Sequence, residues 1–115
     1  MFKAGFDLAK IYLPNAKNCN YTFKTIHAIS HGGQEGMLTC SGLFLPKAEC
    51  CSEIFRGSSI NGEIGDVVLP ESKDISDMFM YCHNITSVRS IQAPKAELCK
   101  YLFCGCENLH TIGIV

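Results

Sequence analysis

Ala93-Pro94-Lys95-Ala96-Glu97-Leu98-Cys99-Lys100-Tyr101-Leu102-Phe103 is the stretch that decides the fold, because its pattern occurs four times in the chain. The 115 residues include four prolines, and each lies nine residues before a phenylalanine. The pairs are Pro14 with Phe23, Pro46 with Phe55, Pro70 with Phe79, and Pro94 with Phe103. The last three prolines are 24 residues apart, and the first gap is 32. A fixed period in this range is the signature of a solenoid.

The residues before each proline predict a short β-strand. Before Pro94, Val88 and Ile91 lie six and three positions upstream, and mostly apolar residues hold these positions before the other prolines. Because proline lacks the N–H group that a β-ladder needs, it belongs at the end or the edge of a strand. We expect the residues three and one positions before the proline to point inward: Ile11 and Leu13, Leu43 and Leu45, Val67 and Leu69, and Ile91 and Ala93.

The residue between each inward pair should point outward, because side chains alternate along a strand. These outward residues are Tyr12, Phe44, Val68 and Gln92. Two positions earlier, the residues expected to flank them are Lys10, Gly42, Asp66 and Ser90. Neighbouring strands lie about 4.8 Å apart, so the four outward residues would form one stripe. An exposed apolar stripe beside charges is typical of a recognition surface. The alternative is that strand propensity alone explains these residues, or that a missing neighbour covers them.

The segment from each proline to its phenylalanine fits either a strand or a helical turn. A cysteine or isoleucine lies five residues after each proline, at Cys19, Cys51, Ile75 and Cys99. This residue and the phenylalanine are four positions apart, so they share a face in either structure. We expect the four phenylalanines to form a stacked, buried column.

The eight extra residues in the first gap predict a loop insertion at about 30–37, where Gly32, Gly33 and Gly36 favour flexibility. A tolerated surface insertion and a binding loop are both open. We expect a single domain over residues 1–115. Neither end shows the polar cap that repeat arrays normally carry. This favours a fragment of a longer array, or end-to-end packing with another copy.

The motif Phe-x-x-Cys-x-Asn-Leu/Ile-x-x-Ile/Val resembles the BspA-like leucine-rich repeat. It occurs at Phe79-Met80-Tyr81-Cys82-His83-Asn84-Ile85-Thr86-Ser87-Val88 and again at Phe103-Cys104-Gly105-Cys106-Glu107-Asn108-Leu109-His110-Thr111-Ile112. The likeness is best in residues 69–115, and the earlier units depart from it, with Ser58 and Ile26 for the cysteine. The resemblance implies an α/β or mainly β fold, a right-handed solenoid of about four coils of 24 residues with short parallel strands. It also implies adhesion or protein recognition, often at bacterial or protist surfaces, and supplies no catalytic residues.

Charge and hydropathy exclude several classes of protein. Ten Lys and Arg against eleven Asp and Glu give a net charge of −1, which argues against nucleic acid as a partner. No apolar run is long enough for a membrane span. The first seven residues lack the basic-then-apolar order of a secretory signal. The sequence therefore favours a cytoplasmic protein or an excised fragment, whereas the family is often surface-exposed.

Eight cysteines in a short chain would suggest disulfides in a secreted protein. The repeat argues instead for reduced, buried thiols, because Ile75 takes the position of three of them. A lateral disulfide between neighbouring coils is the alternative. The nearest approach to a metal site is Cys104 and Cys106 with His83 and His110, but the two cysteines should face opposite ways, which suits zinc poorly.

No phosphate-binding, zinc-protease or nucleophile motif occurs, so we expect no catalytic site, metal or cofactor. The favoured hypothesis is a non-enzymatic module that binds a protein partner or a host surface ligand. The alternative is a structural or assembly component of a fibre, virion or surface layer that self-associates by stacking its uncapped ends.

Overall fold

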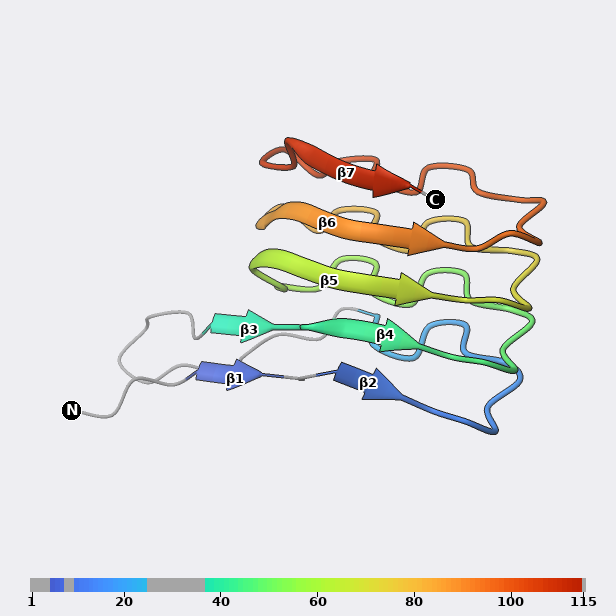
Figure 1. Ribbon diagram of the computed structural model, residues 1–115. Coiled ribbons are helices and arrows are strands. Elements are labelled where there is room, and N and C mark those ends of the chain that lie inside the picture. The colour runs from blue at the N-terminus through green and yellow to red at the C-terminus, as the bar shows by residue number, and fades with distance from the viewer. Residues whose placement is uncertain (1–4, 8–9, 25–36, 115) are drawn as a thin grey trace.

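The computed structural model describes residues 5–7, 10–24 and 37–114, which form parallel β-strands joined by turns (Figure 1). The main sheet has five strands, in the order β2 (Lys10–Tyr12), β4 (Gly42–Phe44), β5 (Gly62–Val68), β6 (Ile85–Gln92) and β7 (Thr111–Ile114). A second sheet pairs β1 (Gly5–Asp7) with β3 (Met37–Thr39), also in parallel. No helix occurs in these ranges, so the mainly β prediction is confirmed, whereas the leucine-rich-repeat solenoid stays a prediction.

The register of the sheet follows the spacing of the repeats. Leu43 pairs with Val67, and Val67 with Ile91, each 24 residues further along the chain. Ile11 pairs with Leu43 across a 32-residue gap, so the eight extra residues fall outside the ladder. Phe23 also packs on Phe55 at this wider spacing, which places the excess between Phe23 and β4. The predicted loop at about 30–37 lies outside the described residues, apart from Met37 at the start of β3.

A column of phenylalanine rings runs through the molecule, as the sequence predicts. Phe23, Phe55, Phe79 and Phe103 stack with centroid distances of 5.4, 5.6 and 5.6 Å. The two central rings are fully buried, and the two outer rings are partly buried. The expected inward strand residues are buried too, except Leu13 and Ala93, which are half-buried at the two ends.

The segments after the prolines are neither full strands nor helices, but turns linked from one repeat unit to the next. Single β-bridges join Asn18 to Cys50, Cys50 to Asp74, and Asp74 to Leu98. Every second amide then donates to a carbonyl of the following unit. In the central units the amides of Cys51, Glu53 and Phe55 donate to Asp74, Ser76 and Met78, at 2.8–2.9 Å.

Left-handed backbone recurs at two positions of each turn segment. Seven residues after the proline it occurs at Tyr21, Glu53, Asp77 and Tyr101. Eleven residues after the proline it occurs at Gly57, Tyr81 and Gly105. Because a positive φ costs energy in residues other than glycine, the bonds between units must hold these turns.

Several cysteines act as hydrogen-bond donors to buried backbone, which refines their interpretation as small apolar side chains. The Sγ atoms of Cys82 and Cys106 donate to the carbonyls of Phe55 and Phe79, each at 2.9 Å. Ser58 holds the equivalent position one unit earlier. A thiol or hydroxyl is needed here because a buried carbonyl without a partner would destabilise the turn.

Candidate functional site

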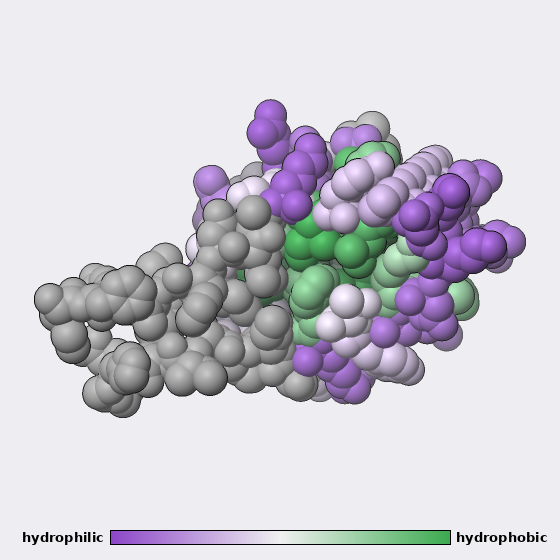
Figure 2. All heavy atoms as spheres, turned by 90° about the horizontal axis from the view of Figure 1, so that it is seen from below, coloured by the Kyte–Doolittle hydropathy of each residue, from purple (hydrophilic) through white to green (hydrophobic). Residues whose placement is uncertain are grey.

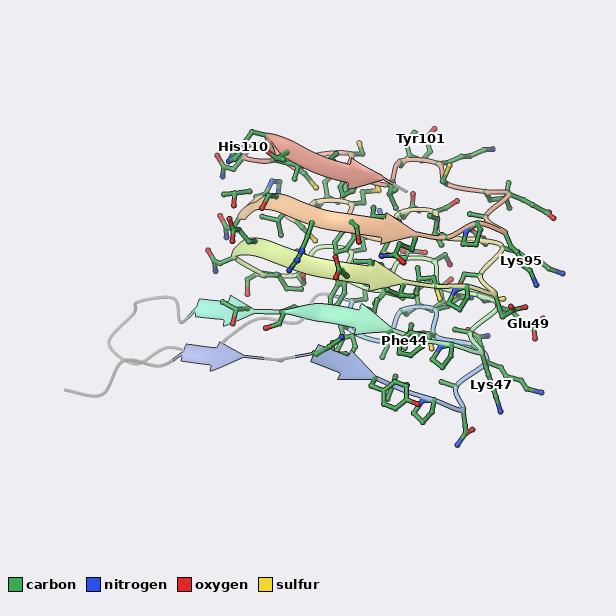
Figure 3. All side chains as sticks on the ribbon, viewed as in Figure 1. Phe44, Lys47, Glu49, Lys95, Tyr101 and His110 are labelled. Carbon is green, nitrogen blue, oxygen red and sulfur yellow. The ribbon has the colours of Figure 1, made fainter. Side chains whose placement is uncertain are left out.

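The predicted outward stripe lies along the carboxyl ends of four neighbouring strands. Tyr12 pairs with Phe44, Phe44 with Val68, and Val68 with Gln92. The rings of Tyr12 and Phe44 stack at 5.3 Å with an angle of 15° between their planes. Tyr12 is 56% exposed, and the other three side chains are half-buried. Figure 3 shows Phe44 where β4 ends. The structure thus brings the stripe together.

The flanking residues also align, but they differ in what they present. Lys10 is exposed and Asp66 is half-buried, whereas Gly42 and Ser90 are buried. Ser90 donates from Oγ to Oδ1 of Asp66 at 2.8 Å and accepts from Nε2 of Gln92 at 3.1 Å. These bonds hold the Asp66 carboxylate and the Gln92 amide in place beside the stripe.

A groove that the sequence interpretation missed opens on the amino-terminal side of the stripe. Its floor follows a register column of Ser41, Gly65, Arg89 and Gly113, and its volume is ≈ 610 Å³. A Cβ at Gly65 would overlap the carbonyl oxygen of Ser41, and one at Gly113 would overlap that of Arg89. The glycines therefore allow adjacent strands to approach closely and leave the surface hollow.

The groove was missed because the strands do not alternate strictly. Buried residues lie three apart in β5, at Ile64 and Val67, and again in β6, at Val88 and Ile91. Two consecutive residues therefore lie between each buried pair, which creates the extra column. The register irregularity between Val88 and Ile91 accompanies this change. The three-residue spacing of apolar positions before each proline could have indicated it.

The charges on this face are of both signs. The Arg89 side chain is 78% exposed, and its Nε lies 3.7 Å from Oδ1 of Asp66. Glu63 and Thr111 are exposed at the rim of the groove. Such a surface can offer aromatic contact at one end and hydrogen bonds and ionic contacts at the other.

The residues weighed for metal binding are apart or otherwise engaged. Cys104 and His110 are exposed, and His83 lies 3.5 Å from a Glu107 carboxylate oxygen. Within the described parts of the chain, no three His, Cys, Asp or Glu side chains gather where they could hold a metal ion. The same ranges contain no helix long and apolar enough to cross a membrane.

All eight cysteines are free thiols. Burial raises the pKa of Cys51 and of Cys106 to about 11, and burial raises the pKa of Cys82 as well. A raised pKa keeps a thiol protonated and therefore poorly nucleophilic at neutral pH. These three cysteines are structural rather than reactive.

No family model matches the chain, and no curated protein or solved structure matches it either. The resemblance to BspA-like repeats therefore stays a prediction that depends on the motif itself.

Proposed function

We propose that this chain is a leucine-rich-repeat solenoid of the BspA-like kind, with about four right-handed coils, and that it works as a protein-recognition or adhesion module. The 24-residue register of the strands and the stacked phenylalanine column support the solenoid. Repeats of this length bury their core by stacking on neighbours, which leaves one continuous strand face for binding.

The observation that carries the function is the joining of the aromatic stripe and the hollow polar groove on one face. Tyr12 and Phe44 provide large, stacked apolar area, and Arg89 provides an exposed guanidinium. Tyr and Arg are enriched among the residues that dominate protein interfaces. Polar groups around an apolar patch are also typical of such interfaces.

The chemistry of the face favours a polypeptide partner. Lys10 and Arg89 are balanced by Glu63 and Asp66, so no single-sign field would attract a polyanion. The glycine-lined groove can admit an extended segment, with an apolar side chain placed on the Tyr12 and Phe44 rings. No residue of the face requires a covalent role, so the proposed function is binding alone.

Selection of random peptides displayed on phage against the 115-residue chain would test this proposal. We expect the enriched peptides to lose binding to the double variant Tyr12→Ser with Phe44→Ser, and to Arg89→Ala. Tyr81→Asn is the matched control, because Tyr81 is also an exposed tyrosine but lies in the turn after Phe79. Circular dichroism and thermal melting would verify that the variants fold.

Peptides that bind the strand-face variants as well as the original chain would contradict the proposal. Unfolding of the Tyr12 and Phe44 double variant would instead mean that these side chains belong to the core, and that the outward assignment is wrong. Arg89→Ala keeps the test informative in that case, because its side chain is largely exposed.

A further inference from the structure

Large exposed apolar side chains concentrate at the two ends of the stack of repeat units. Six such side chains occur in the described residues, and five belong to the first or the last unit: Tyr12, Tyr21, Leu98, Tyr101 and Ile112. Tyr21 is 54% exposed and Tyr101 is 65% exposed, and both hold the position seven residues after a proline. Figure 2 shows the N-terminal end, where apolar side chains are bordered by hydrophilic ones.

The backbone groups at the two ends are complementary. Inside the stack, the amides of Ile75, Asp77 and Phe79 donate to Leu98, Lys100 and Leu102 of the next unit. The equivalent amides of the last unit have no acceptor among the described residues, namely those of Cys99, Tyr101 and Phe103. In the first unit the equivalent carbonyls have no donor within the same ranges, namely those of Asn18, Asn20 and Thr22.

The charges show which surface each end fits. Three residues after the prolines, the exposed side chains alternate in sign along the stack: Lys17, Glu49, Lys73 and Glu97. One residue after the prolines, Lys95 and Glu71 form an ion pair of 2.7 Å. Figure 3 shows Lys47, Glu49 and Lys95 along this corner, pointing away from the strands. Placing Lys17 of a second copy beside Glu97 would continue the alternation without a like-charge contact.

We propose that this chain self-associates head to tail, with the last unit of one copy stacked on the first unit of the next. The contact would add Phe23 of the second copy to the phenylalanine column above Phe103, and would cover Tyr101 with Tyr21. The free amides of the last unit would donate to the free carbonyls of the first. Because the two surfaces differ, the contact is heterologous and leaves each assembly open to further copies.

This self-association goes beyond recognition on the strand face and does not depend on it. Stacking along the axis adds units to the sheet and leaves the outward side chains of each strand accessible. Unpaired strand edges are a known route by which chains associate. The alternation of charge restricts this route to one register and one orientation.

Two end-specific double variants would test the proposal in the 115-residue chain. Glu97→Lys with Tyr101→Asn alters the C-terminal end, and Lys17→Glu with Tyr21→Asn alters the N-terminal end. Asparagine tolerates the positive φ at both tyrosines, 55° and 64°. Tyr81→Asn, at a φ of 62°, is the matched control away from both ends. Circular dichroism would verify folding.

Sedimentation velocity between about 1 μM and about 1 mM is the measurement. The average mass of the original chain and of Tyr81→Asn should rise steadily with concentration. Each end variant should have the mass of a single chain. An equal mixture of the two end variants should form a dimer and stop there, because each retains the surface that the other lacks.

Three results would overturn the proposal. The original chain could stay a single chain over the whole range. Both end variants could associate as the original does, which would place the contact elsewhere. One end variant could dimerise alone while the mixture forms nothing new, which would mean that like ends meet.

Discussion

The central and terminal repeat units differ in burial although their sequences are alike. Phe55 and Phe79 are fully buried, whereas Phe23 and Phe103, at the same register position, are only partly buried. Each ring is covered by the rings above and below it, so an outer ring lacks one cover. Burial in this molecule is therefore a property of neighbouring units rather than of the residue type.

The thiols show the same contrast. Cys51 is fully buried, and Cys99 is exposed, although both lie five residues after a proline. Only Cys51 has a following unit above it, where Ser72 lies 3.1 Å from its Sγ. A chemical property inferred from register alone would thus be wrong at the ends.

The largest effect that would test this contrast is removal of a ring. Phe79→Ala should destabilise the fold by about 3–5 kcal/mol, because it leaves a cavity between two units. Phe103→Ala should cost only about 1–2 kcal/mol, because its ring buries less area. Urea denaturation of both variants would measure the difference in the free energy of unfolding.

Two nearly equal losses in that experiment would show that the outer ring is as buried as the inner one. A loss below about 1 kcal/mol for Phe79→Ala would contradict the register itself.

A second comparison uses the glycines that admit close strand contacts. Gly65→Ala should destabilise by about 1–3 kcal/mol, because its Cβ would meet the Ser41 carbonyl and β5 is held by strands on both sides. Gly113→Ala meets the Arg89 carbonyl, but β7 has one neighbour and can shift. Thermal melting should show the smaller loss for Gly113→Ala, and the reverse order would refute this explanation.

Alkaline pH should weaken the central units through Cys51. Burial raises the pKa of its thiol from 9.0 to about 11, so between these values the unfolded chain has lost a proton that the folded chain keeps. The free energy of unfolding should therefore be largest below about pH 9 and fall by on the order of 1–2 kcal/mol as pH rises to about 11. Urea titrations across this range would measure the slope.

Cys51→Ala is the control for that slope, since lysines and tyrosines titrate in the same range. The variant should be less stable throughout but should lose less stability per pH unit. An unchanged slope would mean that the Cys51 thiol is not desolvated.

The smallest effect concerns thiol accessibility. In the native protein, the exposed Cys99 and Cys104 should be alkylated first, and the buried Cys51 and Cys82 last. In denaturant without reductant, nearly all eight cysteines should be labelled, which mass spectrometry can count. Protected pairs after denaturation would reveal disulfides and contradict reduced thiols.

Much of the fold follows from the spacing of proline and phenylalanine. The prolines end the strands, and the constant distance to the phenylalanine predicts the stacked column. The outward stripe was also predictable, because Tyr12, Phe44, Val68 and Gln92 lie between inward pairs. In these places a strong local pattern and the packing agree.

The sequence could not resolve the turns or the groove. A spacing of four between Cys51 and Phe55 fits strand and helix alike, and only hydrogen bonds to the next unit select the turn. The positive φ at Glu53 and Asp77 has no sequence signal, since neither residue is glycine. The groove depends on glycines and on one extra residue between buried positions, details that strict alternation hides.

Hydrogen exchange of single amides, measured by NMR in dilute and in concentrated solution, tests the central claim most directly. In dilute solution the amides of Cys51, Glu53 and Phe55 should be protected, because each donates to the next unit. The equivalent amides of Cys99, Tyr101 and Phe103 should exchange rapidly. On concentration, protection should appear at these three amides as copies stack. Equal protection of both sets in dilute solution, or no gain at the last unit on concentration, would contradict the account.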